Sequence, residues 1–176
     1  RGIAGAIRIN LREGRGALTG HGGSTITQQT AKLLCLGKPY KAKDWKSESH
    51  YEANCRQSSL WRKVKEALFA IALELEFTKD EILTLYLNRV FLGAGSRGFQ
   101  AASQRYFDKP ASDLNPAESA MLAGLLVAPS RYAPTNNLSK SQNRANIILN
   151  LMAQQGLLSK ELAKYYTENP AKLSIK

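Results

Sequence analysis

Residues 61–87 read WRKVKEALFAIALELEFTKDEILTLYL, and their pattern predicts two consecutive helices. The first covers 61–77, because apolar side chains recur there at the spacing of three and four residues that places them on one helical face. Thr78 and Glu81 form a capping-box pattern, so we expect a second helix to begin there and to end near Leu87. Because these two helices follow each other directly, we expect a helical fold for the rest of the chain.

Further helices are predicted on both sides of this pair, over 1–12, 26–36, 98–107, 116–128, 139–155 and 160–169. Residues 38–60 are polar and show no periodicity, so we expect a surface excursion there. No stretch shows the sustained alternation typical of a strand. The sequence therefore predicts a mainly α fold, with a minor β element at most, hidden in the excursion. A length of 176 residues fits a single domain, 1–176.

The charge of the chain is strongly asymmetric. Its net charge is +11, and residues 1–65 hold 13 Lys and Arg against 4 Asp and Glu, whereas residues 66–176 hold 12 against 10. Such a field favours an anionic partner: nucleic acid, a phosphate-bearing lipid or an acidic membrane surface. The longest apolar runs, 67–73 and 121–128, are far shorter than the roughly 20 residues of a membrane-spanning helix. An apolar content of 43% argues against general disorder.

Two cysteines, Cys35 and Cys55, bracket most of the excursion. Their spacing leaves open both a disulfide, in an oxidising compartment, and two free buried thiols. His21 and His50 are far from any paired cysteines, so we do not expect a structural zinc site.

Residues 20–32, GHGGSTITQQTAK, carry the first candidate site. Glycines at 22 and 23 let a ligand approach the backbone just before a helix N-terminus, where free N–H groups favour an anion. One face of that helix carries a hydroxyl, two amides and an ammonium, which suit a sugar or phosphate group: Thr25, Gln28, Gln29 and Lys32. A capped amphipathic helix with a solvated side explains the same pattern.

The second candidate site centres on Glu66. Arg62 and Lys63 precede it by four and three residues, so both cations can reach its carboxylate on a helix. The apolar residues of the same face follow Glu66, and a carboxylate that heads a buried face is a candidate for perturbed ionisation. An ordinary helical ion pair, worth about 0.3–0.5 kcal/mol, is the structural alternative.

Four segments, GGSTITQQ, RKVKE, KDEILTLYLN and RGFQAASQRYFDK, occur in this order. They resemble four of the five motifs of the peptidoglycan glycosyltransferases of family 51, the transglycosylase domain of class A penicillin-binding proteins. The resemblance covers almost the whole chain and implies a lysozyme-like, mainly helical fold with a membrane-facing lobe. The excursion bracketed by the cysteines resembles the version in some proteobacterial members.

The resemblance implies the polymerisation of lipid II into glycan strands, with inversion at the anomeric carbon and release of polyprenyl pyrophosphate. Glu66 resembles a catalytic glutamate of the family, and the resemblance leaves open a divalent ion, Mg²⁺ or Mn²⁺, near it. The implied substrate-binding residues are Ser24, Thr25, Gln28, Gln29, Lys32, Arg62, Lys63 and Lys65. On this interpretation, the segments 25–32 and 62–66 form one basic groove.

The resemblance also implies partners and a location. The partners are lipid II, the growing lipid-linked strand, a membrane surface and a transpeptidase domain that follows in the same polypeptide, and they include no nucleic acid. The implied location is the periplasmic face of the bacterial inner membrane, where a Cys35–Cys55 disulfide would be favoured.

One motif departs from the family pattern. The first motif, which carries the general-base glutamate, would lie before Arg1. We therefore expect the chain to be a fragment that does not polymerise lipid II by itself. Three alternatives remain open: a lytic enzyme that cleaves murein on a similar fold, a basic helical nucleic-acid-binding module, and a scaffold that binds the lipid-linked substrate without turnover.

Overall fold

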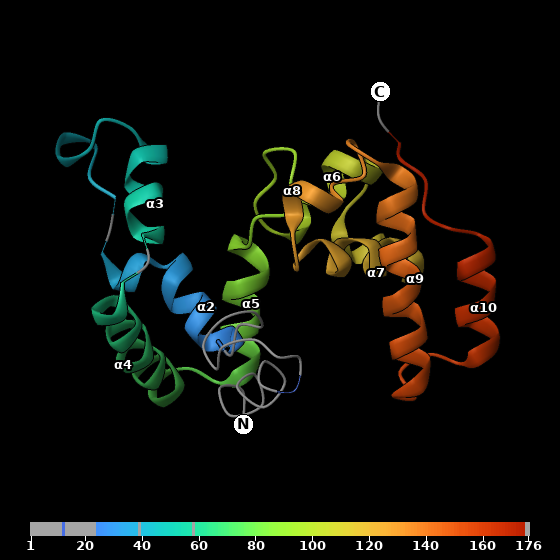
Figure 1. Cartoon of the computed structure of the whole chain (residues 1–176), viewed down its shortest axis with the longest axis horizontal. Coiled ribbons are helices and arrows are strands. Elements are labelled where there is room, and N and C mark those ends of the chain that lie inside the picture. Colours follow the sequence, from blue (N-terminus) through green and yellow to red (C-terminus); the bar gives the residue numbers. More distant parts are fainter. Residues whose placement is uncertain (1–11, 13–23, 39, 58, 175–176) are drawn as a thin grey trace. The chain divides into compact units, whose positions relative to one another are not determined.

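The computed structural model describes residues 12, 24–38, 40–57 and 59–174 (Figure 1). The chain divides into two compact units, Arg1–Tyr86 and Leu87–Lys176. The helix predicted over 1–12 and the two glycines at 22 and 23 lie outside the described residues. The assignment of 1–176 to a single domain stays a prediction.

The first unit is built around the packing of two helices, α2 and α4. In chain order, its elements are α2 (Ile26–Leu33), the short 3-10 helices η1 (Cys35–Gly37) and η2 (Ala42–Asp44), α3 (Glu48–Arg56), α4 (Leu60–Glu76) and α5 (Lys79–Arg89), which runs into the second unit. Ala31 of α2, Leu73 of α4 and Ile82 of α5 form the small buried core of this unit. These residues fix the helices that carry the candidate site.

The two helices predicted from residues 61–87 are confirmed as α4 and α5. Ser59 accepts a hydrogen bond from the Arg62 N–H at 3.1 Å and begins α4. The Thr78 N–H donates to the Glu81 carboxylate at 2.8 Å, which completes the capping box at the start of α5. Side-chain caps of this kind satisfy N–H groups that have no partner within the helix, and this explains why the boundaries were predictable.

A polar contact also joins α2 to α4. The Thr27 hydroxyl donates to a carboxylate oxygen of Glu74 at 2.6 Å. Lys79 pairs with the same carboxylate at 2.7 Å. The hydrogen bond from Lys79, followed by that from Thr27, lowers the pKa of Glu74 below its ordinary value.

The excursion is more ordered than its sequence predicts. It contains α3, a nine-residue helix whose N-cap, Ser47, accepts from the His50 N–H at 3.1 Å. The described side chains of α3 are exposed or half-buried, so no apolar face marks the helix in the sequence. Rings of Trp45 and Tyr51 pack edge to face at its start, and Cys55 is bonded to Cys35 near its end. No strand occurs within 40–57, where a β element remained open.

The second unit is a helical bundle. Its elements are α6 (Phe99–Phe107), the 3-10 helix η3 (Ala111–Asp113), α7 (Pro116–Leu125), α8 (Pro129–Tyr132), α9 (Leu138–Gln154) and α10 (Lys160–Glu168). Helix α9 packs against both α7 and α10, as Figure 1 shows. Tyr106, Leu122 and Leu149 are among the fully buried residues of its core. The mainly α fold class is therefore confirmed, and the β structure in the described part of the chain is a single isolated bridge, Phe91–Arg97.

Two boundaries in this unit differ from the prediction. The helix predicted to reach residue 128 ends at Leu125, and α8 follows as a separate turn of helix. Helix α9 is capped by Asn137, whose side chain accepts from the Lys140 N–H at 2.9 Å, rather than by Ser139. Asparagine and serine are equally good caps, so the sequence alone could not rank them.

A tight turn joins α5 to α6. Leu92 N–H donates to the Ser96 carbonyl at 3.0 Å, and Gly98 N–H donates to the Val90 carbonyl at 2.8 Å. Gly98 has a φ of +81°, and a Cβ there would lie 2.6 Å from the Asn88 carbonyl oxygen. This position requires glycine for both reasons. Among the described helices, none combines the length and the apolar character needed to cross a membrane.

Candidate functional site

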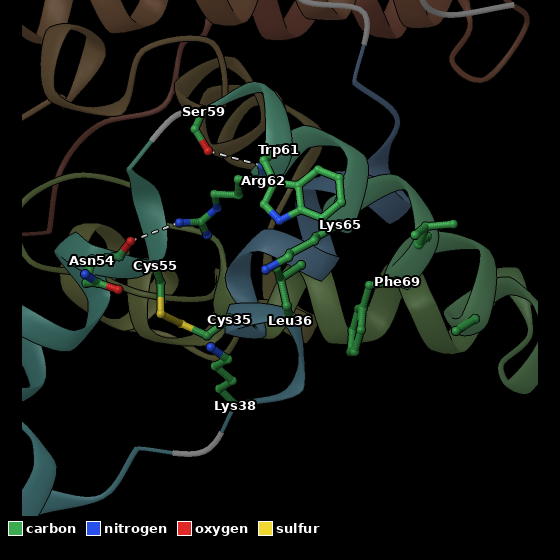
Figure 2. A pocket seen from close by; sticks show the side chains of 12 residues that line it. Cys35, Leu36, Lys38, Asn54, Cys55, Ser59, Trp61, Arg62, Lys65 and Phe69 are labelled. Carbon is green, nitrogen blue, oxygen red and sulfur yellow. Dashed lines mark hydrogen bonds between the residues drawn. A yellow bond between two sulfur atoms is a disulfide. The ribbon is translucent and has the colours of Figure 1, made fainter.

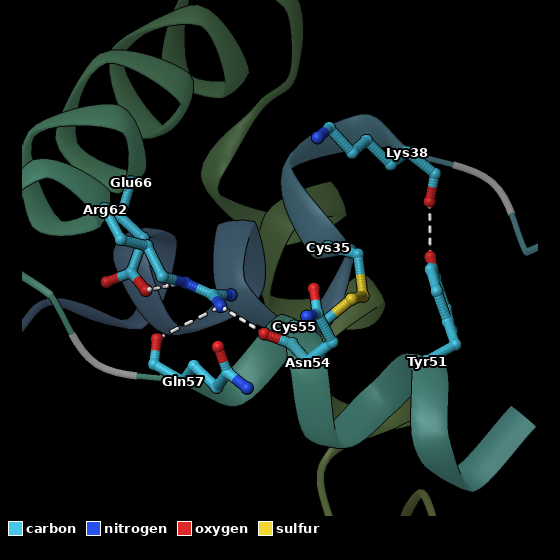
Figure 3. Close-up of a disulfide and its surroundings, with 8 residues drawn as sticks. All are labelled: Cys35, Lys38, Tyr51, Asn54, Cys55, Gln57, Arg62 and Glu66. Carbon is cyan, nitrogen blue, oxygen red and sulfur yellow. Dashed lines mark hydrogen bonds and ion pairs between the residues drawn. A yellow bond between two sulfur atoms is a disulfide. The ribbon is translucent and has the colours of Figure 1, made fainter. Parts of the chain in front are cut away.

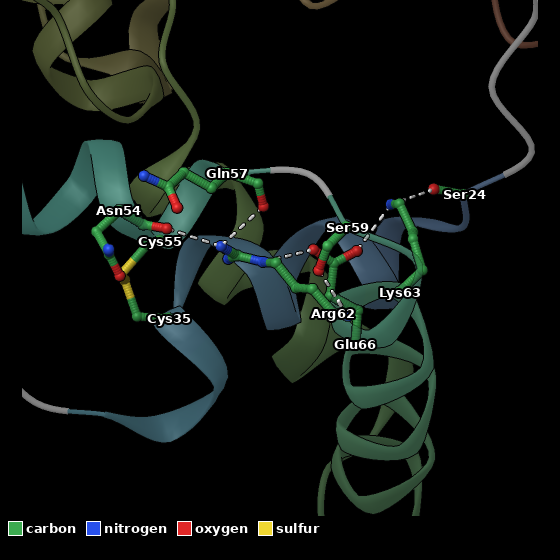
Figure 4. A network of polar contacts seen from close by, with 9 residues as sticks. All are labelled: Ser24, Cys35, Asn54, Cys55, Gln57, Ser59, Arg62, Lys63 and Glu66. Carbon is green, nitrogen blue, oxygen red and sulfur yellow. Dashed lines mark hydrogen bonds and ion pairs between the residues drawn. A yellow bond between two sulfur atoms is a disulfide. The ribbon is translucent and has the colours of Figure 1, made fainter.

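The centre of the candidate site is the carboxylate of Glu66 (Figure 4). Glu66 is only 3% exposed. Its Oε1 lies 3.2 Å from Arg62 Nε, and its Oε2 lies 2.7 Å from Lys63 Nζ. A buried carboxylate is stable only when cations or hydrogen bonds compensate for its lost hydration. The pairing expected from the spacing of these residues is therefore present, and burial makes it more than a surface ion pair.

Arg62 is held by the backbone of α3 as well as by Glu66 (Figure 3). Its Nη1 donates to the Asn54 carbonyl at 2.9 Å and to the Gln57 carbonyl at 3.2 Å. The last carbonyls of a helix lack partners within the helix, so they are natural acceptors for a guanidinium. The Arg62 side chain is 15% exposed. Most of its donors therefore face the protein.

Lys63 differs from Arg62 because its side chain is 54% exposed. Its Nζ lies 3.4 Å from the Ser24 hydroxyl, in addition to its contact with Glu66. This contact joins the segment that precedes α2 to the start of α4. An ammonium has three N–H donors, so Lys63 retains capacity for an external anion.

The polar residues of α2 make local contacts. Thr25 and Gln28 form a reciprocal capping box, with hydrogen bonds of 3.1 and 3.2 Å. The Tyr86 hydroxyl donates to the Gln29 side-chain oxygen at 3.3 Å, and burial raises the pKa of Tyr86. Capping, the structural alternative for this segment, therefore accounts for two of the four residues.

The polar stripe of α2 and the buried residues of α2 lie on different faces of the helix. The buried residues of α2 are Thr27, Thr30 and Ala31. At 100° per residue, the stripe defined by residues 25, 28, 29 and 32 is on the opposite side of the helix. The structure brings Arg62 and Lys63 to Glu66, and it brings Ser24 to Lys63. The single basic groove expected from the segments 25–32 and 62–66 stays a prediction.

A pocket of about 600 Å³ opens beside the Arg62 network (Figure 2). It is lined by Cys35, Leu36, Lys38, Asn54, Cys55, Ser59, Trp61, Arg62, Lys65, Leu68, Phe69 and Ala72. Lys65 Nζ lies 5.7 Å from the centroid of the Trp61 ring, within the range of a cation–π contact. The lining contains three cations and no carboxylate, so it suits an anionic group with an apolar part.

Cys35 and Cys55 are bonded to each other, with their Cα atoms 5.2 Å apart. Of the two alternatives that the spacing left open, the structure has the disulfide. No sequence pattern indicates the role of Asn54 and Gln57, because both act through backbone carbonyls, which every residue type carries.

The described residues offer no ready metal site. No group of three His, Cys, Asp or Glu side chains gathers anywhere in the described ranges. Both oxygens of Glu66 are already paired with cations. A single carboxylate with this surrounding does not fit the oxygen-rich ligand set that Mg²⁺ prefers.

Comparisons with known proteins give a consistent result. A family described as Transglycosylase matches residues 1–153. Penicillin-binding protein 1A of Pseudomonas aeruginosa is 40% identical over 153 residues, which are 87% of this chain and 16% of that protein. Penicillin-binding protein 1A of Aquifex aeolicus is 39% identical over 159 residues, which are 90% of this chain and 19% of that protein.

A solved structure shares the fold. The crystal structure of penicillin-binding protein 1A from Haemophilus influenzae matches 84% of this chain and 17% of that chain, with 28% identity and a TM-score of 0.52. The chain thus spans less than a fifth of the length of these relatives.

Proposed function

The chain belongs to the transglycosylase family, and we propose that it forms the polymerising part of a peptidoglycan glycosyltransferase. In the proposed reaction, a sugar 4-hydroxyl of lipid II attacks the anomeric carbon of the growing lipid-linked strand. The configuration inverts, and polyprenyl pyrophosphate leaves. The reaction needs a base for the hydroxyl and cations for the charge that develops on the pyrophosphate.

The observation that carries this proposal is the buried Glu66 carboxylate beside the exposed ammonium of Lys63. We assign Glu66 to the stabilisation of the reacting centre and Lys63 to the pyrophosphate. Arg62 is largely enclosed, so its main contribution is to hold Glu66. Ser24 lies within reach of Lys63 and lines the same site.

The remaining predicted binding residues fall into two groups. Lys65 lies in the pocket beside Arg62, where an anionic, partly apolar group fits. The second group is Thr25, Gln28, Gln29 and Lys32, and its contact with the donor substrate stays a prediction. A divalent ion near Glu66 also stays a prediction. The described residues do not fit one unaided, and we derive no step through it.

We further propose that the protein works at a membrane surface, on the periplasmic side. Helix α4 exposes a row of large apolar side chains: Leu60, Trp61, Val64, Leu68, Ile71 and Leu75. An apolar helical face on a segment with excess positive charge is typical of proteins that bind anionic membranes. The greater length of the relatives supports a further domain, such as a transpeptidase, in the same polypeptide.

The test is a comparison of two substitutions on α4 in the polypeptide that carries this chain. Glu66→Gln keeps the shape of the side chain but removes its charge, and we expect turnover of labelled lipid II to fall by about 100-fold or more. Glu76→Gln is the matched control, because Glu76 is exposed on the same helix. Equal rates in the two variants would contradict the assignment of Glu66.

Product analysis separates the proposed function from its rivals. Polymer formation from lipid II supports a transferase, whereas release of short fragments from finished glycan, without polymer formation, would identify a lytic enzyme. Binding of lipid II without turnover would identify a scaffold. Salt-sensitive retention on DNA without affinity for lipid II would identify the nucleic-acid-binding alternative.

A further inference from the structure

We propose that the Cys35–Cys55 disulfide is a brace that positions Arg62 against Glu66 and thereby sets the catalytic competence of the Glu66 carboxylate. The inference rests on the proposed function for the role of Glu66. Three consecutive links carry it: from the disulfide to α3, from α3 to Arg62, and from Arg62 to Glu66 (Figures 3 and 4).

The first link is covalent. The disulfide ties η1, which follows α2 directly, to the C-terminal part of α3 across a separation of 20 residues. No described side chain of α3 is fully buried. Among the described side chains, its other attachments include the hydrogen bond from the Tyr51 hydroxyl to the Lys38 carbonyl and the ring contacts of Tyr51 with Tyr40 and Trp45. The Cys35–Cys55 bond is therefore the covalent tie that holds the end of α3 against η1.

The second link runs through the end of α3. Asn54 is the neighbour of Cys55 in the chain, and Gln57 is the C-cap of the helix. Both carbonyl oxygens accept from Arg62 Nη1, at 2.9 and 3.2 Å. The C-terminal end of a helix carries partial negative charge, so a guanidinium bound there is favoured electrostatically as well. The disulfide at Cys55, one residue from Asn54 and two from Gln57, holds these acceptors in place.

The third link reaches the reacting carboxylate. Arg62 Nε donates to Glu66 Oε1 at 3.2 Å. A guanidinium is planar and rigid, so fixing Nη1 also fixes the direction of the Nε–H bond. Lys63 contacts the other oxygen of Glu66 through a flexible and half-exposed side chain. It therefore supplies positive charge but does not orient the carboxylate as the rigid guanidinium does. Arg62 is therefore a positioning residue, and the brace acts on Glu66 through it.

The test begins with removal of the brace. In the polypeptide that carries the chain, we expect the Cys35→Ala/Cys55→Ala pair to lower kcat about tenfold or more, the effect of losing one hydrogen bond to a charged group. KM should change by less than about threefold, because the exposed cations stay. Dithiothreitol reduces the disulfide: Cys35 and Cys55 become thiols, and the reagent is oxidised to its own cyclic disulfide. This treatment should lower the kcat of the unmodified protein to that of the double variant. It should leave the double variant unchanged.

Non-additivity distinguishes a brace from general destabilisation. In a Glu66→Gln background, removing both cysteines should give no further loss of rate, because the residue on which the brace acts is already altered. Arg62→Lys keeps the charge and the disulfide but loses the rigid fork, and it should reproduce the kcat loss. If the cysteine pair fails to fold, reduction of the unmodified protein takes its place, and Arg62→Lys tests the last link, from Arg62 to Glu66. If the losses of rate from Glu66→Gln and from removal of both cysteines simply add, the proposed brace is wrong.

A measurement independent of activity completes the test. In arginine labelled with nitrogen-15, we expect the Arg62 Nε–H to exchange slowly with water in the disulfide form and at least about tenfold faster after reduction. Unchanged exchange would overturn the brace even if the enzyme is active. Full activity of Glu66→Gln would instead overturn the proposed function, and the exchange measurement would still decide whether Arg62 is held by the disulfide.

Discussion

Lys63 and Arg62 are adjacent in the sequence and both contact Glu66, yet their surroundings give them different roles. Arg62 is enclosed by the end of α3, whereas Lys63 is open to solvent. A cation that is open to solvent can bind an incoming phosphate group without breaking its structural contacts. The pair therefore separates orientation of the carboxylate from contact with substrate.

The first prediction concerns the exposed lysines. Lys63→Ala and Lys65→Ala should each weaken binding of a phosphoglycolipid inhibitor about tenfold, the effect of losing one charge-assisted contact to phosphate. The thermal midpoint should change little for Lys65→Ala, because that side chain is exposed, whereas Lys63→Ala should also lower it, because Lys63 is a partner of the buried Glu66 carboxylate. Lys32→Ala tests the α2 stripe in the same way. Calorimetric titration and thermal melts measure the two effects, and a fall in midpoint with unchanged affinity would make these lysines structural.

The second prediction concerns the pH dependence of stability. The hydrogen bond from the Thr78 N–H, and then that from the Thr78 hydroxyl, lowers the pKa of Glu81 below 4.5 in the folded state. The stabilisation is therefore present above the ordinary pKa and is lost as the pH falls through the lowered value. Glu81→Gln should remove this contribution. The difference in unfolding free energy between wild type and variant should then be largest near about pH 7 and shrink towards about pH 3.

Urea unfolding at several pH values measures this difference. Glu76→Gln serves as the control, because Glu76 has no comparable cap to complete. A difference between wild type and Glu81→Gln that stays constant across the pH range would contradict the role of the Glu81 charge.

At the scale of elements, the turn between α5 and α6 depends on the backbone of Gly98. Gly98→Ala places a Cβ 2.6 Å from the Asn88 carbonyl oxygen and requires an alanine at a φ of +81°. We expect a loss of about 2 kcal/mol or more in unfolding free energy. Gly95→Ala is a matched control with a φ of +77° and no atom within 4 Å, and we expect about 1 kcal/mol. Denaturant unfolding measures both, and equal losses would exclude a steric origin.

The elements with strong local signals could be predicted from the sequence. Helices α4 and α5 combine apolar periodicity with side-chain caps, and both were predicted within about two residues. Helix α3 could not be predicted because its described side chains form no apolar face, and a disulfide and ring contacts leave no helical period in the sequence. Helix α8 was missed because a single turn of four residues is too short for periodicity.

The candidate site was predictable where it depends on spacing along one helix. The pairing of Glu66 with Arg62 and Lys63 follows from positions three and four residues apart. The sequence could not show that Thr27, Thr30 and Ala31 form the buried face of α2, because periodicity identifies two faces and does not say which one is buried. It also could not show the carbonyl acceptors of Arg62, which depend on where α3 ends.

At the scale of the whole molecule, the excess positive charge and the apolar row of α4 belong to the same end of the sequence. We predict binding to vesicles that contain an anionic phospholipid, with affinity that falls as salt rises. Leu75→Glu, at a site 83% exposed on α4, should weaken binding about tenfold, whereas Leu157→Glu, at a site 70% exposed in the second unit, should not. Vesicle flotation measures both. Equal losses of vesicle binding in the two variants would contradict a specific role of α4 in membrane binding.

The loop closed by Cys35 and Cys55 has one further consequence, for limited proteolysis. The stretch 40–46 between η1 and α3 contains three exposed lysines, Lys41, Lys43 and Lys46, each a site for trypsin. A cut at any of them leaves the two pieces covalently joined, so the nicked chain keeps its full mass on a non-reducing gel. The same sample separates into two bands only once a thiol reagent is added to the loading buffer.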